Sequence, residues 1–262
     1  MLRRRALASL PAFARRMSGR APAPVVRREG TTLHVLPAGG AAPTSVIVLM
    51  HGLGDTAAGW VDVAAGPLAR ALPRAAWVLP TASTRPVTIN GGAPMPAWYD
   101  IRSLTAHREL ETCDGIDASV AAVRRALAAA RAAHGLPARR TVLAGFSQGG
   151  AMALFAGLSD ADTLAGVVSM SGYLPLPGRL AAPAAAALAT PALLCHGTAD
   201  AVVPLSYGAD ARDRLAGLGA AAVTWKTYAG MGHGVCDEEL EDVADFLRKC
   251  LPEEEAPAGQ RV

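Results

Sequence analysis

The sequence lacks any apolar run long enough to cross a bilayer. Its longest apolar stretch, residues 180–195, is mostly Ala and is interrupted by Pro183, Thr190 and Pro191. Charged residues are also scarce, at 18% of the 262 positions, whereas hydrophobic residues make up 51%. This hydrophobic share excludes a disordered chain, and the length suits one α/β domain with a substantial core.

Cysteines are few, and none has the spacing of a metal site. A chain of this length with only four of them is not a disulfide scaffold, so we expect reduced thiols in an intracellular protein: Cys113, Cys195, Cys236 and Cys250. No two histidines form a local ligand pair such as H-x-x-x-H, which argues against a metal. Residues 145–150 have the glycine spacing of a phosphate loop, but Ala151 and Met152 replace its Lys and Ser/Thr. We therefore expect no metal, nucleotide or other cofactor.

Charge is unevenly distributed along the chain. Residues 1–28 hold eight Arg and no acidic residue, while the remainder holds 17 Lys and Arg against 22 Asp and Glu. The body is therefore mildly acidic, which argues against a nucleic-acid partner. The basic leader is typical of a transit peptide for a mitochondrion or plastid. The alternatives are a tail that contacts an anionic membrane, an idle tail, or an upstream extension of a protein starting at Met17.

Between the leader and a polar tail at residues 253–262, strand and helix patterns alternate over residues 29–252. Short apolar runs predict buried strands at residues 45–50, 76–79, 141–144 and 167–170, with two more at 191–195 and 223–228. Apolar residues at helical spacing predict a helix from Ile116 that stops at Gly135, and a last helix capped by Asp237. This order predicts one domain with a mostly parallel, doubly wound sheet and helices on both faces. The aperiodic residues 81–112 and 174–190 are expected to shape a site.

The most informative motif is Gly145-Phe146-Ser147-Gln148-Gly149, which matches G-x-S-x-G. An apolar strand precedes it and a small-residue helix opening follows, which is the context that this motif requires. The chain reverses so sharply at the serine that side chains two positions either side would collide, so both glycines are needed. The turn directs the Ser147 hydroxyl toward a helix N-terminus, where partial positive charge favours a developing anion. We therefore predict that Ser147 is a nucleophile.

A serine hydroxyl needs a base, and the base needs an orienting acid. In this kind of fold the order along the chain is Ser, acid, His. Asp200 follows a predicted strand and a Gly-containing loop, and His233 lies between glycines after the last strand. Both positions are at the carboxyl ends of strands, where open α/β sheets place their sites. Asp200 and His233 are therefore the predicted acid and base.

Acyl transfer also needs donors for the oxyanion. The backbone N–H of Gln148 is one prediction, and the N–H of Leu53, in the glycine-flanked loop after the strand at 45–50, is the other. His51 is predicted to hold this loop, with substrate contact as the alternative. His196 is predicted to brace the loop of the acid.

Five stretches together resemble the acyl-protein thioesterase, lysophospholipase and carboxylesterase group of α/β hydrolases. They are VIVLMHGLGDTAAGW (46–60), RPVTINGGAPMPAWYDI (85–101), GFSQGGAMAL (145–154), HGTADAVVP (196–204) and MGHGV (231–235). The resemblance implies the α/β-hydrolase fold, the triad Ser147, Asp200 and His233, and the Leu53 and Gln148 amides as the oxyanion hole. It implies hydrolysis of S-palmitoyl groups on proteins, of lysophospholipids or of simple esters, without a cofactor, in the cytoplasm.

The substrate groove is predicted less directly. Apolar side chains from the aperiodic segments are expected to line it: Leu53, Trp60, Met95, Trp98 and Leu176. For each of them, packing in the core is the alternative. At the level of function, the alternatives are a lysophospholipase, a short-chain esterase, or an α/β-hydrolase-fold protein that binds small molecules with little turnover. The oligomeric state is not predicted.

Overall fold

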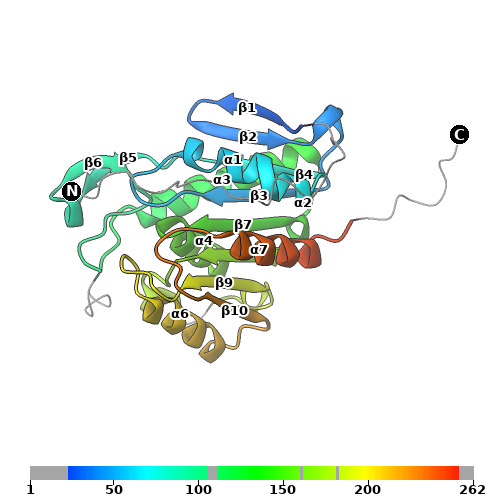
Figure 1. Cartoon of the computed structure of the whole chain (residues 1–262). Helices are drawn as coiled ribbons and strands as arrows, with labels where there is room; N and C mark the ends of the chain where they lie inside the picture. The colour runs from blue at the N-terminus through cyan, green and yellow to red at the C-terminus, as the bar shows by residue number, and fades with distance from the viewer. Residues whose placement is uncertain (1–22, 105–110, 160–161, 181–182, 254–262) are drawn as a thin grey trace, which may run out of the picture.

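The protein is described by a computed structural model that covers residues 23–104, 111–159, 162–180 and 183–253. Its centre is an eight-stranded sheet in the order β1-β2-β4-β3-β7-β8-β9-β10 (Figure 1). The strands are β1 (Val25–Glu29), β2 (Thr32–Leu36), β3 (Ser45–Met50), β4 (Ala75–Leu79), β7 (Thr141–Phe146), β8 (Gly166–Met170), β9 (Ala192–Gly197) and β10 (Val223–Tyr228). All pairs from β4 to β10 are parallel, whereas β1–β2 and β2–β4 are antiparallel. The predicted mostly parallel sheet is confirmed.

Helices cover both faces of this sheet, as predicted. They are α1 (Val61–Val63), α2 (Ala69–Ala71), α3 (Ile116–His134), α4 (Gln148–Leu158), α5 (Ala185–Leu188), α6 (Leu205–Gly217) and α7 (Asp237–Cys250). The side chains of α3, α4 and α6 join one hydrophobic cluster, and those of α1 and α7 join a second one across the sheet. Within the large sheet, the strands β3, β4, β7, β8 and β9 are buried along their length, apart from Phe146, because they lie between these two layers.

The order of the strands decides where the site lies. From β3 the chain first goes to β4 on one side of β3, and later returns to β7 on the other side. The connections that leave the carboxyl ends of β3 and β7 therefore diverge, and ligands of open α/β sheets bind at such a point. Leu53 lies in the loop after β3, and Ser147 follows β7 directly.

Three sequence predictions change in detail. Residues 25–28, assigned to the leader, form most of β1 and pair with β2, so the sheet begins before residue 29. The N-cap of α7 is Cys236, and Asp237 is the first residue of the helix, where its charge still favours the helix dipole. Within the aperiodic residues 81–112, β5 (Thr84–Val87) and β6 (Ala93–Pro96) form a separate antiparallel hairpin.

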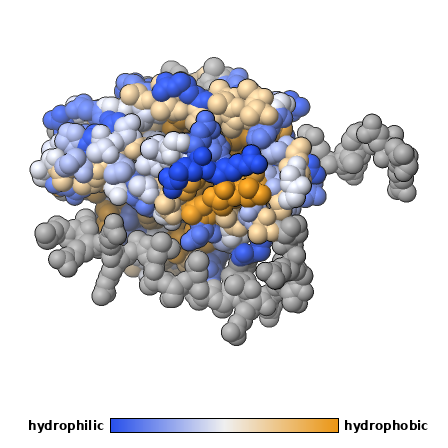
Figure 2. Space-filling view, turned by 90° about the horizontal axis from the view of Figure 1, so that it is seen from above, coloured by the Kyte–Doolittle hydropathy of each residue, from blue (hydrophilic) through white to orange (hydrophobic). Residues whose placement is uncertain are grey.

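One edge of the sheet lies at β1, whose residues are all exposed, and the other lies at β10. Seen from above, the β1 side of the molecule carries an apolar strip beside hydrophilic residues (Figure 2). Val25 and Val26 are among the exposed large hydrophobic residues, and Arg27 and Arg28 continue the same strand. Leader residues 1–22 and tail residues 254–262 lie outside the described residues, so the transit-peptide prediction is untested. Within the part that is described, no helix is long and apolar enough to cross a membrane.

Candidate active site

The turn between β7 and α4 holds Ser147 in an unusual backbone conformation, with φ 54° and ψ −119°. Such a turn brings neighbouring backbone very close. A Cβ on Gly145 would lie 2.2 Å from the carbonyl oxygen of Gly149, and a Cβ on Gly149 would lie 2.2 Å from that of Met50. Only glycine fits at both positions, because these contacts are to backbone that cannot move aside. The steric reason for G-x-S-x-G is therefore present here.

Three side chains that are distant in sequence meet beside this turn. His233 Nε2 lies 2.9 Å from Ser147 Oγ, and His233 Nδ1 lies 2.8 Å from Asp200 Oδ2. Ser147 follows β7, Asp200 follows β9, and His233 follows β10. All three strands end at the same edge of the sheet because they run parallel. The arrangement matches a nucleophile, its base and an orienting acid.

The carboxylate of Asp200 is fully buried and fully hydrogen-bonded. Its Oδ1 accepts the backbone N–H groups of Val202 and Val203, both at 2.9 Å, and its Oδ2 accepts from His233. Burial by itself raises the pKa of a carboxyl group, but these hydrogen bonds outweigh it and hold the pKa of Asp200 below its usual value. Asp200 is therefore an anion at neutral pH and can stabilise the protonated form of His233.

The loop after β3 lies directly against the nucleophile. A Cβ on Gly52 would lie 3.4 Å from Ser147 Cβ, so the loop is in van der Waals range. Neither the Leu53 N–H nor the Gln148 N–H finds a hydrogen-bond acceptor among the residues that the structure describes. Two unpaired donors, one in the loop beside Ser147 and one at the N-terminus of α4, are what an oxyanion requires.

His51 orients the first of these donors. Its Nδ1 lies 2.7 Å from the carbonyl oxygen of Gly52, and its Nε2 accepts the Ala82 N–H at 3.0 Å. Because Nε2 is an acceptor, the proton lies on Nδ1, which donates to Gly52. Burial lowers the pKa of His51, so the ring stays neutral, as this pattern demands. The Gly52 carbonyl and the Leu53 N–H belong to one trans peptide and point in opposite directions. The hydrogen bond from His51 to the Gly52 carbonyl therefore also fixes the direction of the Leu53 N–H.

Replacing His51 with Phe tests this role. Phe keeps the ring packing against Trp98, at 5.1 Å between centroids, but loses both hydrogen bonds. We expect kcat to fall by about 10²- to 10³-fold with little change in KM, as for the loss of one oxyanion donor. The matched variant His51→Asn can place an amide N–H where Nδ1 donates and should recover part of kcat. Equal losses in both variants, or a loss confined to KM, would contradict the role.

His196 is buried beside the acid. Its Nε2 lies 2.8 Å from the Val203 carbonyl oxygen and 3.6 Å from Asp200 Oδ2. Burial lowers its pKa, so this ring is also neutral. It connects the end of β9 with the residues that hydrogen-bond Asp200, which agrees with the predicted bracing role. The described residues contain no group of three or more His, Cys, Asp or Glu that could hold a metal ion.

Of the predicted groove residues, two tryptophans belong to the core. Trp60 packs on Phe146, with ring centroids 5.2 Å apart, and Trp98 donates its indole N–H to the His51 carbonyl at 2.8 Å. They are only 6% and 2% exposed, so packing, which was the alternative, is their observed state. Met95 and Leu53 are half-buried, and Met95 lies near Gly54 of the loop after β3.

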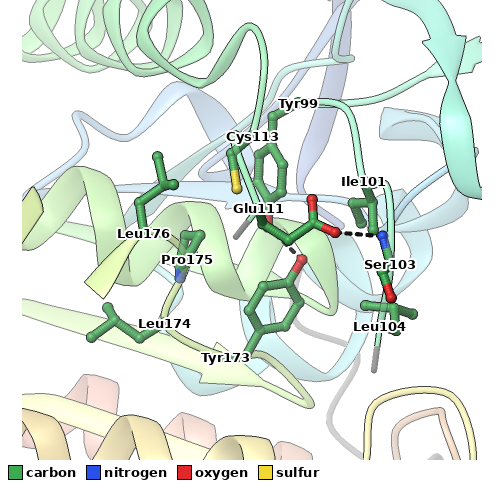
Figure 3. Close-up of a pocket in the computed structure, with 10 residues that line it drawn as sticks. All are labelled: Tyr99, Ile101, Ser103, Leu104, Glu111, Cys113, Tyr173, Leu174, Pro175 and Leu176. Atoms are coloured by element: carbon green, nitrogen blue, oxygen red, sulfur yellow. Dashed lines mark hydrogen bonds between the residues drawn. The ribbon is translucent and has the colours of Figure 1, made fainter. Parts of the chain in front are cut away.

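Leu176 lines a small hollow with an accessible volume of about 10 Å³ (Figure 3). The figure shows Leu174, Pro175 and Leu176 on one side, and Ile101 and Leu104 on the other. The remaining lining residues are Tyr99, Ser103, Glu111, Cys113 and Tyr173. The hydroxyl of Tyr99 donates to that of Tyr173 at 2.8 Å. The sequence marked both aperiodic segments as site-forming, but no local signal pointed to the two tyrosines.

The fold and this geometry together define a serine hydrolase of the α/β-hydrolase class. The family model described as phospholipase/carboxylesterase matches residues 33–251, and the chain belongs to this family of ester and thioester hydrolases. Acyl-protein thioesterase 1 of Mycosarcoma maydis is 39% identical over 238 residues, covering 84% of this chain and 97% of the relative. The crystal structure of Zea mays acyl-protein thioesterase 2 is similar, with 32% identity and a TM-score of 0.71, over 85% of this chain and 100% of that chain. Arabidopsis thaliana SOBER1 matches with 30% identity and a TM-score of 0.69, over 79% and 99%.

Proposed function

We propose that this protein removes S-linked acyl groups from acylated proteins, and cleaves small acyl esters, through an acyl-enzyme on Ser147. The observation that carries the proposal is the hydrogen-bonded series Ser147 Oγ, His233 and Asp200, at 2.9 and 2.8 Å. The names of the relatives support the thioester substrate class.

The proposed cycle has two halves. His233 takes the Ser147 proton as the hydroxyl oxygen attacks the acyl carbonyl, and the oxyanion is held by the Leu53 and Gln148 amides. The protonated imidazole, held by Asp200, then gives the proton to the leaving thiolate or alkoxide. In the second half His233 activates water, which releases the fatty acid and frees Ser147.

We assign the acyl chain to the hollow of Figure 3, which has to widen to admit it. Its apolar walls of Ile101, Leu104, Leu174 and Leu176 suit methylene groups, each worth about 0.8 kcal/mol when buried. Tyr99, which lines the hollow, is hydrogen-bonded through its carbonyl oxygen to the side chain of Gln148, the residue after Ser147. We propose on this ground that the acyl carbon at Ser147 and the chain in the hollow belong to one continuous site.

A substrate panel tests the proposal. We expect kcat/KM for an S-octanoyl or S-palmitoyl peptide to exceed kcat/KM for an acetyl ester by at least tenfold, since about two more buried methylenes supply that factor. A lysophospholipid has an equally long chain, so we expect it to be the poorer substrate because its alkoxide is a worse leaving group than a thiolate. A preference for the acetyl ester would favour the short-chain esterase, and one for the lysophospholipid the lysophospholipase. Absence of turnover with every substrate would favour the binding protein.

For the compartment, we propose the cytoplasm on the strength of the resemblance. The Arg-rich leader supports the alternative, a mitochondrion or plastid.

A further inference from the structure

The side chain of Gln148 has a task separate from that of its backbone. It is 1% exposed, and its amide hydrogen-bonds with two consecutive residues of a distant segment. Oε1 accepts the Trp98 N–H at 3.0 Å, and Nε2 donates to the Tyr99 carbonyl oxygen at 2.7 Å. An apolar side chain of the same length would leave both backbone groups without these partners inside the core, which is costly.

These two bonds connect the nucleophile turn to the hollow. Gln148 follows Ser147 directly and begins α4, whereas Tyr99 lines the hollow and meets Tyr173 on its other side. A displacement of the segment at Trp98–Tyr99 would therefore move a wall of the hollow relative to Ser147.

We propose that the Gln148 side chain is a positioning residue that sets the preference for acyl-chain length, by holding the Tyr99 wall in register with Ser147. This rests on the proposed function, because it presumes that the hollow receives the chain. Long acyl chains touch that wall and depend on its position. An acetyl group does not reach the Tyr99 wall, so hydrolysis of an acetyl ester depends only on the turn at Ser147.

The same segment has a second buried restraint that does not come from the turn. Ser119 of α3 donates its hydroxyl to the Trp98 carbonyl oxygen. Ser119→Ala therefore removes one side-chain hydrogen bond to the segment and leaves the Gln148 bonds intact. It is the matched control for a general loosening of Trp98–Tyr99.

The test measures the ratio of kcat/KM for an octanoyl ester to kcat/KM for an acetyl ester, with thermal unfolding as a check on folding. The ratio cancels any effect on the triad that both substrates share. We expect Gln148→Met to lower it by about tenfold, which corresponds to losing the contact of roughly two methylene groups. Ser119→Ala is expected to leave it within about twofold of the wild-type ratio.

Gln148→Glu gives a second test that does not depend on the folding of the Met variant. Burial favours a neutral carboxyl group, whose C=O can accept from Trp98 and whose O–H can donate to Tyr99. The ratio should therefore be close to wild type at low pH and fall as the pH rises, since the carboxylate loses the donor. The wild-type ratio should not change with pH.

The proposal is overturned by an unchanged ratio in Gln148→Met, by an equal fall in Ser119→Ala, or by a ratio in Gln148→Glu that is independent of pH. A failure of this proposal can be distinguished from a failure of the proposed function, because the latter is seen in the wild-type protein. If wild-type turnover of both esters is no faster than that of Ser147→Ala, the hydrolase assignment itself is wrong.

Discussion

Replacing Ser147 with Ala is expected to lower kcat for ester hydrolysis by about 10⁶-fold. The variant has no oxygen to attack the acyl carbon, so His233 has no proton to accept. Substrate binding should persist, because the hollow and the oxyanion amides remain. The measurement is turnover of a chromogenic ester, together with equilibrium binding of a non-hydrolysable analogue.

The matched control is Ser171→Ala at the end of the neighbouring strand β8. Ser171 is also buried and also has a positive φ, 48°, and its hydroxyl has no hydrogen-bond partner in the described part of the chain. This variant should keep kcat within a few fold. If Ser147→Ala retained a tenth of wild-type activity, or Ser171→Ala lost as much as Ser147→Ala, the nucleophile would have to be sought elsewhere.

Replacing Asp200 with Asn is expected to lower kcat by about 10⁴-fold. The two N–H donors of Val202 and Val203 hold an acceptor oxygen at the Oδ1 position, so the new NH₂ group must face His233 Nδ1. The imidazole then takes its proton on Nε2 and cannot accept one from Ser147. The geometry survives while the tautomer is wrong, so KM and thermal stability should change far less than kcat.

Asp210→Asn is the control for the charge removed. Asp210 pairs with Arg214 on α6, away from the triad, and its loss should leave kcat unchanged. A similar kcat in Asp200→Asn and the wild type would show that the acid has no part in orienting the histidine.

The buried strands and the three candidate catalytic residues were predictable from the order and pattern of the sequence. The run Ser45–Met50 has no polar residue after its first, and it forms a strand buried on both faces. At Ser147, close backbone contacts require glycine at both flanks: Gly145 lies against Gly149 within the turn, and Gly149 lies against Met50 of β3. The positions of Asp200 and His233 followed from the parallel direction of the strands, which brings their carboxyl ends to one edge.

For other residues the sequence left alternatives open, and only the structure shows where the side chains lie. Trp60 and Trp98 are as apolar as a groove requires, but the core has room for both, and Trp98 satisfies its indole N–H on the His51 carbonyl. Residues 25–28 look like the end of a basic leader, and only their pairing with β2 makes them a strand. Their side chains are all exposed, so no buried face marks the strand in the sequence.

The sequence alone thus determined the class of chemistry. The glycines on both sides of Ser147 indicate the tight turn of a nucleophile, and the strand order places Asp200 and His233 at the same edge of the sheet. The partners of individual side chains were decided only in three dimensions. The Gln148 amide meets a backbone segment some fifty residues earlier, and the His51 ring accepts the Ala82 N–H from 31 residues later. Such contacts join residues that share no sequence neighbourhood, and their hydrogen bonds form only when the packed layers exclude water.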